Sequence, residues 1–273
     1  MQVAAVQMAS GPNVNANLTE AARLIGKAAT AGAGLVVLPE NFALMPMCES
    51  DRLQIAETEG KGPIQAFLAQ QAGMHRIWLV GGTIPLRAEQ PHKVRAACLL
   101  LNEKGEPVAR YDKMHLFDVA LENGERYNES RTFEPGDKTV VVDTPFGRLG
   151  LAVCYDLRFP ELFRRMLDDG TEVFTLPSAF TAVTGKAHWE ILVRARAIEN
   201  LAYMIAAAQG GYHVNGRETF GDSMIVNPWG EILDRLARGS GFVIAELDRK
   251  RLQQVRDTLP SIRHRRIYAD RQE

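Results

Sequence analysis

The chain has 273 residues, of which 46% are hydrophobic and 24% charged, so it is long enough to bury a substantial core as a single globular domain. Its 32 Lys and Arg residues against 33 Asp and Glu residues give a formal net charge of −1, which argues against a general electrostatic attraction to nucleic acid or to an anionic membrane. We therefore expect a small-molecule substrate, and neither a nucleic-acid nor a membrane partner.

Short apolar runs bounded by turn residues recur along the chain and predict β-strands. They lie at Val3–Val6, Leu35–Leu38, Ile77–Val80, Ala96–Leu101, Val140–Val142, Leu149–Val153, Val173–Leu176 and Tyr203–Ala208. Helical patterns with an apolar face alternate with them at Asn15–Thr30, Pro63–His75, Pro160–Asp169 and Lys186–Asn200. Hairpin patterns at Leu100–Arg110 and Met224–Leu233 interrupt the alternation. The order predicts an α/β fold with a mixed sheet or two sheets.

Several classes of protein are disfavoured by missing signals. The N-terminal MQVAAVQMAS lacks a positive n-region and predicts a first strand instead of a signal peptide, and no apolar run approaches the roughly 18 residues of a membrane span. Three widely separated cysteines without a CxxC pair argue against disulfides and structural zinc. HExxH, GxSxG, Walker-A and GxGxxG motifs are all missing from the sequence. We expect a cytoplasmic protein with no metal and no cofactor.

The segment Leu149–Glu161 places a cysteine, Cys154, where an apolar strand ends and shortly before a helix begins at Pro160. Ligands of open α/β sheets bind at this edge, where a sharp turn exposes a side chain and aims backbone N–H groups at a developing oxyanion. The alternative is an inert buried thiol, since free cysteine is among the most buried residue types. Spacing alone leaves both interpretations open.

Two charged residues follow strands in the same way. Glu40 comes after the apolar run ending at Leu38 and Pro39, and Lys113 follows a strand of the first predicted hairpin. Each is also explained as an ordinary surface residue. Taken with Cys154, however, they supply a base for the thiol proton and a cation for the oxyanion, which amide hydrolysis requires.

Three segments resemble, in order, the signature blocks of the nitrilase superfamily: Leu38–Glu40, Tyr111–Leu116 and Cys154–Glu161. The resemblance continues through the Arg194–Asn200 and Asp222–Gly230 regions. It implies a four-layer αββα sandwich over residues 1–273, with roughly the last 25 residues as a tail or dimer contact. It further implies a Glu-Lys-Cys triad of Glu40, Lys113 and Cys154 and assembly as a homodimer or higher homo-oligomer.

The superfamily often has a second glutamate that faces the lysine. We assign it to Glu129, although Glu122 and Glu125 lie in the same polar loop, and a surface carboxylate is the simpler alternative. If Glu129 is buried, we expect it to be hydrogen-bonded and to position Lys113.

Within the superfamily, the sequence looks most like the branch that hydrolyses deaminated glutathione, through Phe159–Leu162, Pro177–Phe180 and Ala206–Gly210. The implied reaction passes through a thioester and yields α-ketoglutarate and cysteinylglycine. The backbone N–H of Tyr155 would help to hold the oxyanion. Arg158 would bind the substrate carboxylate or instead form a salt bridge with Glu161 or another acidic neighbour. Further substrate-binding residues are predicted at Ser178, Phe180 and Thr184, for which packing at a strand end is nearly as good an explanation.

Other functions stay open at this stage. An ω-amidase acting on α-ketoglutaramate would bind the same acyl group, and other superfamily members hydrolyse nitriles or N-carbamoyl compounds. A binding scaffold that keeps the fold without the chemistry is the non-enzyme alternative, and the presence of all three triad residues argues against it.

Overall fold

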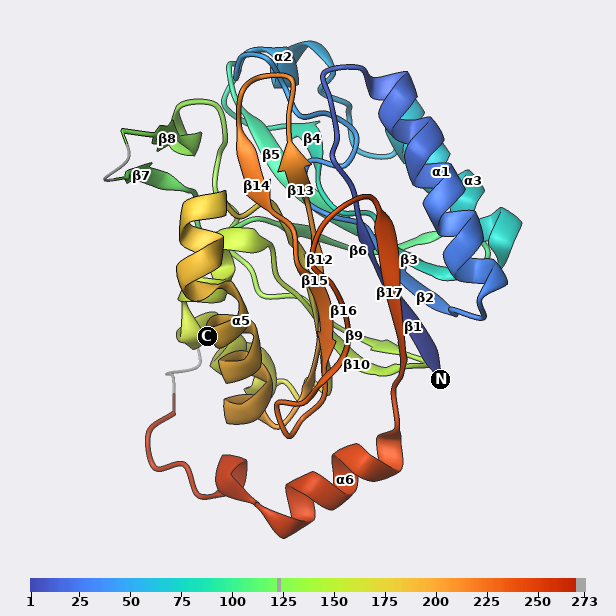
Figure 1. Ribbon diagram of the computed structural model, residues 1–273, viewed down its shortest axis with the longest axis vertical. Helices are drawn as coiled ribbons and strands as arrows, with labels where there is room; N and C mark the ends of the chain where they lie inside the picture. The colour runs from blue at the N-terminus through green and yellow to red at the C-terminus, as the bar shows by residue number, and fades with distance from the viewer. Residues whose placement is uncertain (122–123, 269–273) are drawn as a thin grey trace.

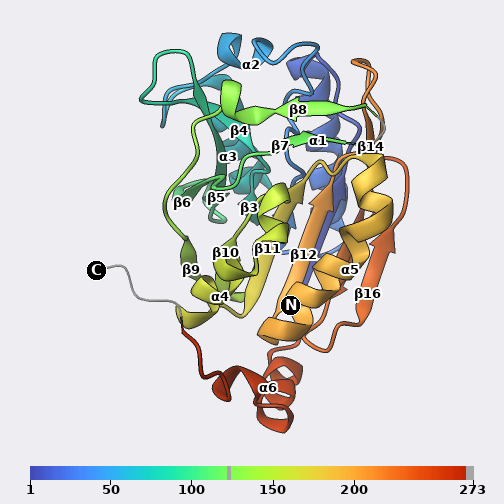
Figure 2. The same cartoon turned by 90° about the vertical axis from the view of Figure 1, so that its left-hand side faces the viewer.

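Two β-sheets lie face to face at the centre of the molecule in the computed structural model, which describes residues 1–121 and 124–268 (Figure 1). Helices α1 (Val14–Thr30) and α3 (Pro63–His75) cover the outer face of one sheet. Helices α4 (Pro160–Asp168) and α5 (Ala182–Asn200) cover the outer face of the other (Figure 2). These four layers confirm the predicted αββα sandwich.

The first sheet has the strand order β17-β1-β2-β3-β5-β4, with β6 beside β5. Strands β1, β2 and β3 run parallel, and the remaining pairs are antiparallel. The strands are β1 (Gln2–Gln7), β2 (Leu35–Val37), β3 (Trp78–Val80), β4 (Ile84–Arg87), β5 (Val94–Leu101), β6 (Pro107–Asp112) and β17 (Gly241–Glu246).

The second sheet has the order β16-β15-β12-β11-β10-β9, and its central strands β10, β11 and β12 are parallel. Its strands are β9 (Val141–Thr144), β10 (Gly147–Leu151), β11 (Val173–Ser178), β12 (Tyr203–Ala208), β15 (Ser223–Val226) and β16 (Ile232–Leu236). Both predicted hairpins are present, as β5–β6 and β15–β16. The sheet is therefore mixed, as the sequence indicated.

Strand β1 shows why the central strands read as continuous apolar runs. Val3 and Ala5 join the core between the two sheets, whereas Ala4 and Val6 join a second core beneath helices α1 and α3. Successive side chains of a strand point to opposite faces, and here both faces are buried, so the run Val3–Val6 is apolar at every position.

Helix α5 begins at Ala182, four residues earlier than the predicted Lys186. The side chain of Thr181 accepts a hydrogen bond from the backbone N–H of Thr184, which is an N-cap arrangement that supports an earlier start. The first turn of α5 contains Val183, Thr184 and Gly185, which are weak helix formers, so the sequence pattern predicts a later start. This shift places Thr184 inside the helix instead of in the preceding loop.

Several short elements were not predicted. Two small hairpins, β7 (Asp118–Ala120) with β8 (Arg126–Asn128) and β13 (Gly210–Tyr212) with β14 (Glu218–Phe220), lie at one end of the molecule (Figures 1 and 2). Short helical segments are α2 (Asp51–Gln54), η1 (Glu129–Arg131), η2 (Cys154–Arg158) and η3 (Ser261–Arg263). Elements of three to five residues carry too little periodicity to be recognised in a sequence.

The segment expected to be a C-terminal tail starts with helix α6 (Arg249–Thr258). Leu252 and Val255 are buried, and the Arg256 guanidinium donates to the carbonyl oxygens of Thr171 and Leu201. This helix is therefore attached to the core of the chain that carries it. A role of the segment in a dimer contact stays a prediction.

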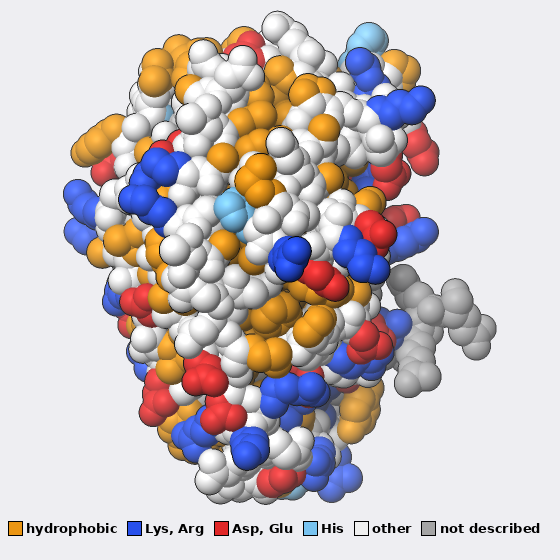
Figure 3. Space-filling view, turned by 90° about the vertical axis from the view of Figure 1, so that its right-hand side faces the viewer, with side chains coloured by type: hydrophobic (Ala, Val, Ile, Leu, Met, Phe, Trp, Pro, Cys, Tyr) orange, Lys and Arg blue, Asp and Glu red, His pale blue; other side chains and the backbone are white. Residues whose placement is uncertain are grey.

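The described helices include none that is long and apolar enough to cross a membrane. On the face that carries α1 and α3, acidic and basic side chains are interspersed, in keeping with a net charge near zero (Figure 3).

Candidate active site

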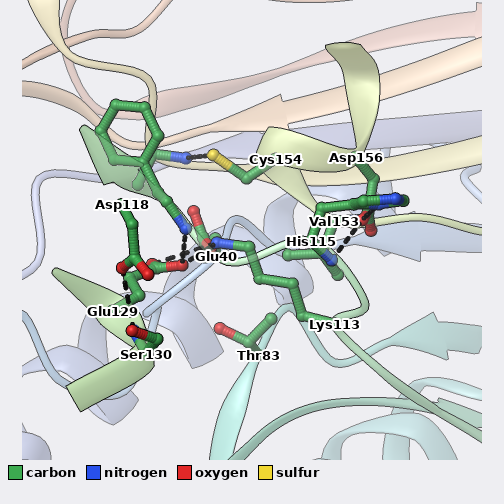
Figure 4. Close-up of polar contacts among 12 residues, drawn as sticks. Glu40, Thr83, Lys113, His115, Asp118, Glu129, Ser130, Val153, Cys154 and Asp156 are labelled. Atoms are coloured by element: carbon green, nitrogen blue, oxygen red, sulfur yellow. Dashed lines mark hydrogen bonds and ion pairs between the residues drawn. The ribbon is translucent and has the colours of Figure 1, made fainter. Parts of the chain in front are cut away.

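The three residues of the predicted triad come from separate strands but lie together (Figure 4). Glu40 follows β2, Lys113 follows β6 directly, and Cys154 begins η2 shortly after β10. All three side chains line one cavity, which has an empty volume of about 700 Å³. The first sheet thus brings Glu40 and Lys113, which are 73 positions apart, into hydrogen-bond contact, and the facing sheet places Cys154 in the same cavity.

Lys113 lies between two glutamates in the interior. Its Nζ is 2.8 Å from Oε1 of Glu40 and 3.0 and 2.8 Å from Oε1 and Oε2 of Glu129. Only 1% of the Lys113 side chain is exposed, so an unpaired ammonium there would be strongly destabilised. Burial alone would lower the pKa of Lys113, but the charges of Glu129 and Glu40 outweigh it and hold the pKa well above its usual value. The lysine is therefore a fixed positive charge.

Glu129 is the glutamate that faces the lysine. It also accepts a 2.8 Å hydrogen bond from the backbone N–H of Phe117. Burial tends to raise its pKa, yet the Lys113 charge and these hydrogen bonds lower it below the usual 4.5. Glu125 instead bonds Tyr127, and the other alternative, Glu122, lies outside the described residues.

Cys154 adopts a left-handed backbone conformation, with φ of 47°, which is rare for a residue with a side chain. Its Sγ lies 3.5 Å from the backbone N–H of Ala179, which follows β11. Burial and then the negative charge of Glu40 raise the pKa of the Cys154 thiol well above 9.0, against the opposing influence of Lys113. The resting sulfur is a neutral thiol that needs a base to become nucleophilic.

A buried aspartate that sequence reasoning missed joins the segments of the site. Asp156 accepts hydrogen bonds from the backbone N–H of Val153 at 2.8 Å and from the Tyr111 hydroxyl at 2.7 Å. Its other oxygen contacts the backbone N–H of His115 at 3.1 Å and that ring's Nδ1 at 2.7 Å. The carboxylate thus ties the turn that carries the cysteine to the segment that carries the lysine. Asp156 lies inside the Cys154–Glu161 signature block, and that position is the feature of the sequence that could have identified it.

Four of the five predicted substrate-binding residues, Tyr155, Arg158, Phe180 and Thr184, line the cavity. Ser178 does not. Its side chain is fully buried at the end of β11, and its hydroxyl donates to the carbonyl oxygen of Leu176. Strand β11 ends at Ser178, and the cavity is lined instead by residues that follow the strand, Ala179, Phe180 and Thr181.

Arg158 is held mainly by aromatic rings. Its guanidinium lies 5.3 Å from the ring centre of Phe180 and 5.8 Å from that of Tyr155, and its Nη1 is 3.2 Å from Nδ1 of His188. The polar contact of Arg158 is therefore with His188. The salt bridge to Glu161, which was the alternative to carboxylate binding, is not formed.

The cavity also has a charged group that sequence reasoning did not find. Glu49, Arg52 and Arg217 line it together with Tyr127. Glu49 pairs with both arginines, although Arg217 lies 168 positions along the chain. No short motif connects these residues, so only the fold reveals the group.

Among residues 1–121 and 124–268, no group of three or more His, Cys, Asp or Glu side chains is arranged to hold a metal ion. The titratable groups of the cavity are instead arranged as a thiol, an ammonium and carboxylates in contact.

A buried thiol, lysine and glutamates at the edge of two facing sheets define the class of this protein. The chain belongs to the carbon-nitrogen hydrolase family, whose profile matches residues 2–257, and it is therefore a hydrolase of carbon–nitrogen bonds. It is 44% identical to the deaminated glutathione amidase of a Synechocystis strain over 96% of this chain and 97% of that protein.

Solved structures agree with this assignment. Saccharomyces cerevisiae Nit3, a member of branch 10 of the nitrilase superfamily, matches with a TM-score of 0.88 and 32% identity over 98% of this chain and 97% of Nit3. The C. elegans NitFhit protein matches with a TM-score of 0.90 and 35% identity. The match covers 97% of this chain and 65% of NitFhit, which is the longer protein.

Proposed function

We propose that this protein is a cysteine-dependent amidase that hydrolyses deaminated glutathione to α-ketoglutarate and cysteinylglycine. The observation that carries the proposal is the buried cluster of Lys113 with Glu40 and Glu129, in the same cavity as Cys154. The substrate class is supported by relatives named deaminated glutathione amidase, at 41–44% identity in Synechocystis, Yersinia enterocolitica and Homo sapiens.

The first half of the reaction would transfer the acyl group to the enzyme. Glu40 accepts the proton of the Cys154 thiol, and the sulfur attacks the amide carbonyl carbon. The oxygen becomes an oxyanion beside the Lys113 ammonium and backbone N–H groups, with that of Tyr155 as the candidate. As the tetrahedral intermediate collapses, the C–N bond breaks and the leaving amine takes the proton from Glu40. The products are free cysteinylglycine and an α-ketoglutaryl thioester.

The second half would release the acid. Glu40 removes a proton from a water molecule, which attacks the thioester carbonyl carbon, and the C–S bond then breaks with return of the proton to Cys154. The net change is addition of one water across the amide bond. Glu129 takes no proton in this scheme; it acts as a positioning residue by holding Lys113 toward the reacting atoms.

Arg158 is the proposed partner of the α-keto acid carboxylate. Its guanidinium lies beside the rings of Tyr155 and Phe180 in the lining of the cavity, which orients a planar group that can bind a carboxylate through two hydrogen bonds. Phe180 and Thr184 would contact the acyl chain. Ser178 is not part of the proposed substrate site, because its side chain is fully buried at the end of β11.

The proposal is tested by measuring α-ketoglutarate formation with purified wild type and Cys154→Ala on deaminated glutathione and on α-ketoglutaramate. We expect a higher kcat/KM for deaminated glutathione and no product from the variant. Preference for α-ketoglutaramate would assign the chain as an ω-amidase. Turnover of neither substrate would refute the proposal and direct the search to nitriles and N-carbamoyl compounds.

We also propose that the protein forms a homodimer or a higher homo-oligomer in the cytoplasm. Ile191 and Ile198 on α5 are 70% and 44% exposed, and Trp229 is 49% exposed, so apolar side chains are available for a subunit contact. A reducing compartment would keep Cys154 as the thiol that the chemistry needs. Light scattering during size-exclusion chromatography tests the assembly, and a single-chain mass of 30.2 kDa would contradict it.

A further inference from the structure

We propose that Arg217 binds the terminal carboxylate of the leaving group and thereby selects deaminated glutathione over smaller amides with the same acyl group. The inference rests on the function proposed above, and it concerns the half of the substrate that the triad and Arg158 do not recognise.

Arg217 lies at the open side of the catalytic cavity. It precedes β14 in the turn of the β13–β14 hairpin, and it lines the same cavity as Cys154. Its side chain is 30% exposed, whereas that of Lys113 at the reacting end is 1% exposed. A long leaving group that extends from the sulfur toward solvent would therefore pass near this guanidinium.

The guanidinium is held in place before any ligand binds. Its Nη2 donates to Oε1 of Glu49 at 2.9 Å, and the guanidinium carbon Cζ lies 4.9 Å from the ring centre of Tyr127. One donor edge is thus occupied and one face is packed on a ring, which leaves further N–H donors for a ligand. Such preorganisation reduces the entropy lost on binding.

A row of aromatic rings connects Arg217 to the proposed acyl site. The ring of Tyr127 is 5.1 Å from that of Phe117, which is 5.0 Å from that of Tyr155. Arg158 then lies over Tyr155 at the opposite end of the row. The lining thus presents an arginine at each end, with apolar ring surface between them.

The charges and the length of deaminated glutathione suit this arrangement. The substrate carries two carboxylates, one on the acyl group and one on the terminal glycine, separated by a chain of three residues that spans roughly 10 Å when extended. The two ring-to-ring distances are 5.1 and 5.0 Å, so a chain of this length is long enough to pass along all three rings. Because α-ketoglutaramate releases only ammonia, it has no group that reaches the second arginine.

Glu49 does not cancel the positive charge at this end of the cavity. The same carboxylate also pairs with Arg52, whose side chain is 4% exposed and whose Nε has no hydrogen-bond partner. Two guanidinium groups therefore share one carboxylate. Two neighbouring negative charges that an anionic leaving group would meet are Glu218, which also lines the cavity, and Glu125, which accepts a hydrogen bond from the Tyr127 hydroxyl.

The test compares wild type with Arg217→Gln on deaminated glutathione, on its C-terminal carboxamide and on α-ketoglutaramate. Loss of a charge-assisted hydrogen bond is expected to lower kcat/KM for deaminated glutathione by roughly 10- to 100-fold more than for α-ketoglutaramate, chiefly through KM. The carboxamide should behave in wild type as deaminated glutathione does in the variant. Arg217→Lys should fall between the two proteins, and Glu218→Gln should change KM in the opposite direction. Arg238→Gln, at an exposed arginine outside the cavity lining, is the matched control.

An equal loss of kcat/KM with both substrates would show that Arg217 only supports the fold, and no loss with either substrate would show that it makes no contact with the leaving group; either result overturns the inference. Failure of the proposed function is distinguishable, because it is seen in wild type as preference for α-ketoglutaramate or as no turnover. Measurable turnover of α-ketoglutaramate by the variant establishes that its triad is intact.

Discussion

The substitution Glu129→Gln tests whether the second glutamate positions the lysine. It keeps the size of the side chain but replaces one carboxylate oxygen by an amide NH₂. Both oxygens of Glu129 contact Lys113 Nζ, and Oε2 also accepts from the Phe117 N–H. The amide offers one acceptor for these three contacts, so a donor is left facing either the ammonium or a backbone N–H.

The size of the effect follows from burial. A hydrogen bond to a charged group contributes about 1.5–3 kcal/mol, and breaking a buried ion pair costs about 3–5 kcal/mol. Glu40 still pairs with Lys113 in the variant, so the loss should stay within the range of a hydrogen bond to a charged group, at about 2–3 kcal/mol. If the lost interaction stabilises the transition state and not the bound substrate, kcat drops by roughly 30- to 150-fold with little change in KM.

The same variant also tests how the free energy of unfolding depends on pH. The pKa of Glu129 is lower in the folded protein than its usual 4.5, so its charge stabilises the fold above that value, and this contribution is lost as the pH falls through the folded pKa. The free energy of unfolding of wild type should therefore exceed that of the variant at pH 7, and the difference should shrink on acidification below 4.5.

The assay combines steady-state kinetics on deaminated glutathione with urea unfolding at neutral and acidic pH. Glu103→Gln, on the exposed turn between β5 and β6, is the matched control and should change neither quantity. A Glu129→Gln enzyme with kcat within about twofold of wild type would refute the positioning role.

Two further perturbations examine the nucleophile and its base. In Glu40→Gln, labelling of Cys154 by a small electrophile at pH 7 should slow by roughly 100-fold or more, because loss of the base outweighs the lower thiol pKa that follows from removal of the Glu40 charge. Exposed Cys48 provides an internal control, and equal labelling rates in both proteins, measured by mass spectrometry, would exclude this base role. Gly82→Ala should lower both stability, by roughly 1–3 kcal/mol, and kcat, since φ is +58° and a Cβ would lie 2.2 Å from a carbonyl oxygen in the loop that carries Glu40. Gly11→Ala, with no heavy atom within 4 Å, should leave urea midpoint and kcat unchanged, and a similar result for both glycines would contradict the steric argument.

The sequence by itself determined the sandwich and the position of the chemistry. Runs such as Val3–Val6 and Leu35–Leu38 are apolar at every position because both faces of the strand are buried, and this pattern is visible without coordinates. Glu40, Lys113 and Cys154 each follow a strand, so the rule that ligands bind at strand ends, together with the family resemblance, brought them to one place.

Only the tertiary structure decided which side chains share the cavity. Glu125 and Glu129 lie in one polar loop, and the contact with Lys113 is what distinguishes Glu129 from Glu125. Ser178 and Phe180 are two positions apart, yet one packs inside and the other lines the cavity, because β11 ends between them.

The arginines of the cavity show the same limit most clearly. Arg52 and Arg217 share Glu49 although they lie far apart in the chain and in unrelated segments. Secondary structure follows from local patterns of polarity, but electrostatic contacts depend on distance in space. The distances between these charged groups are set when the two sheets pack together, and they cannot be predicted from local sequence patterns.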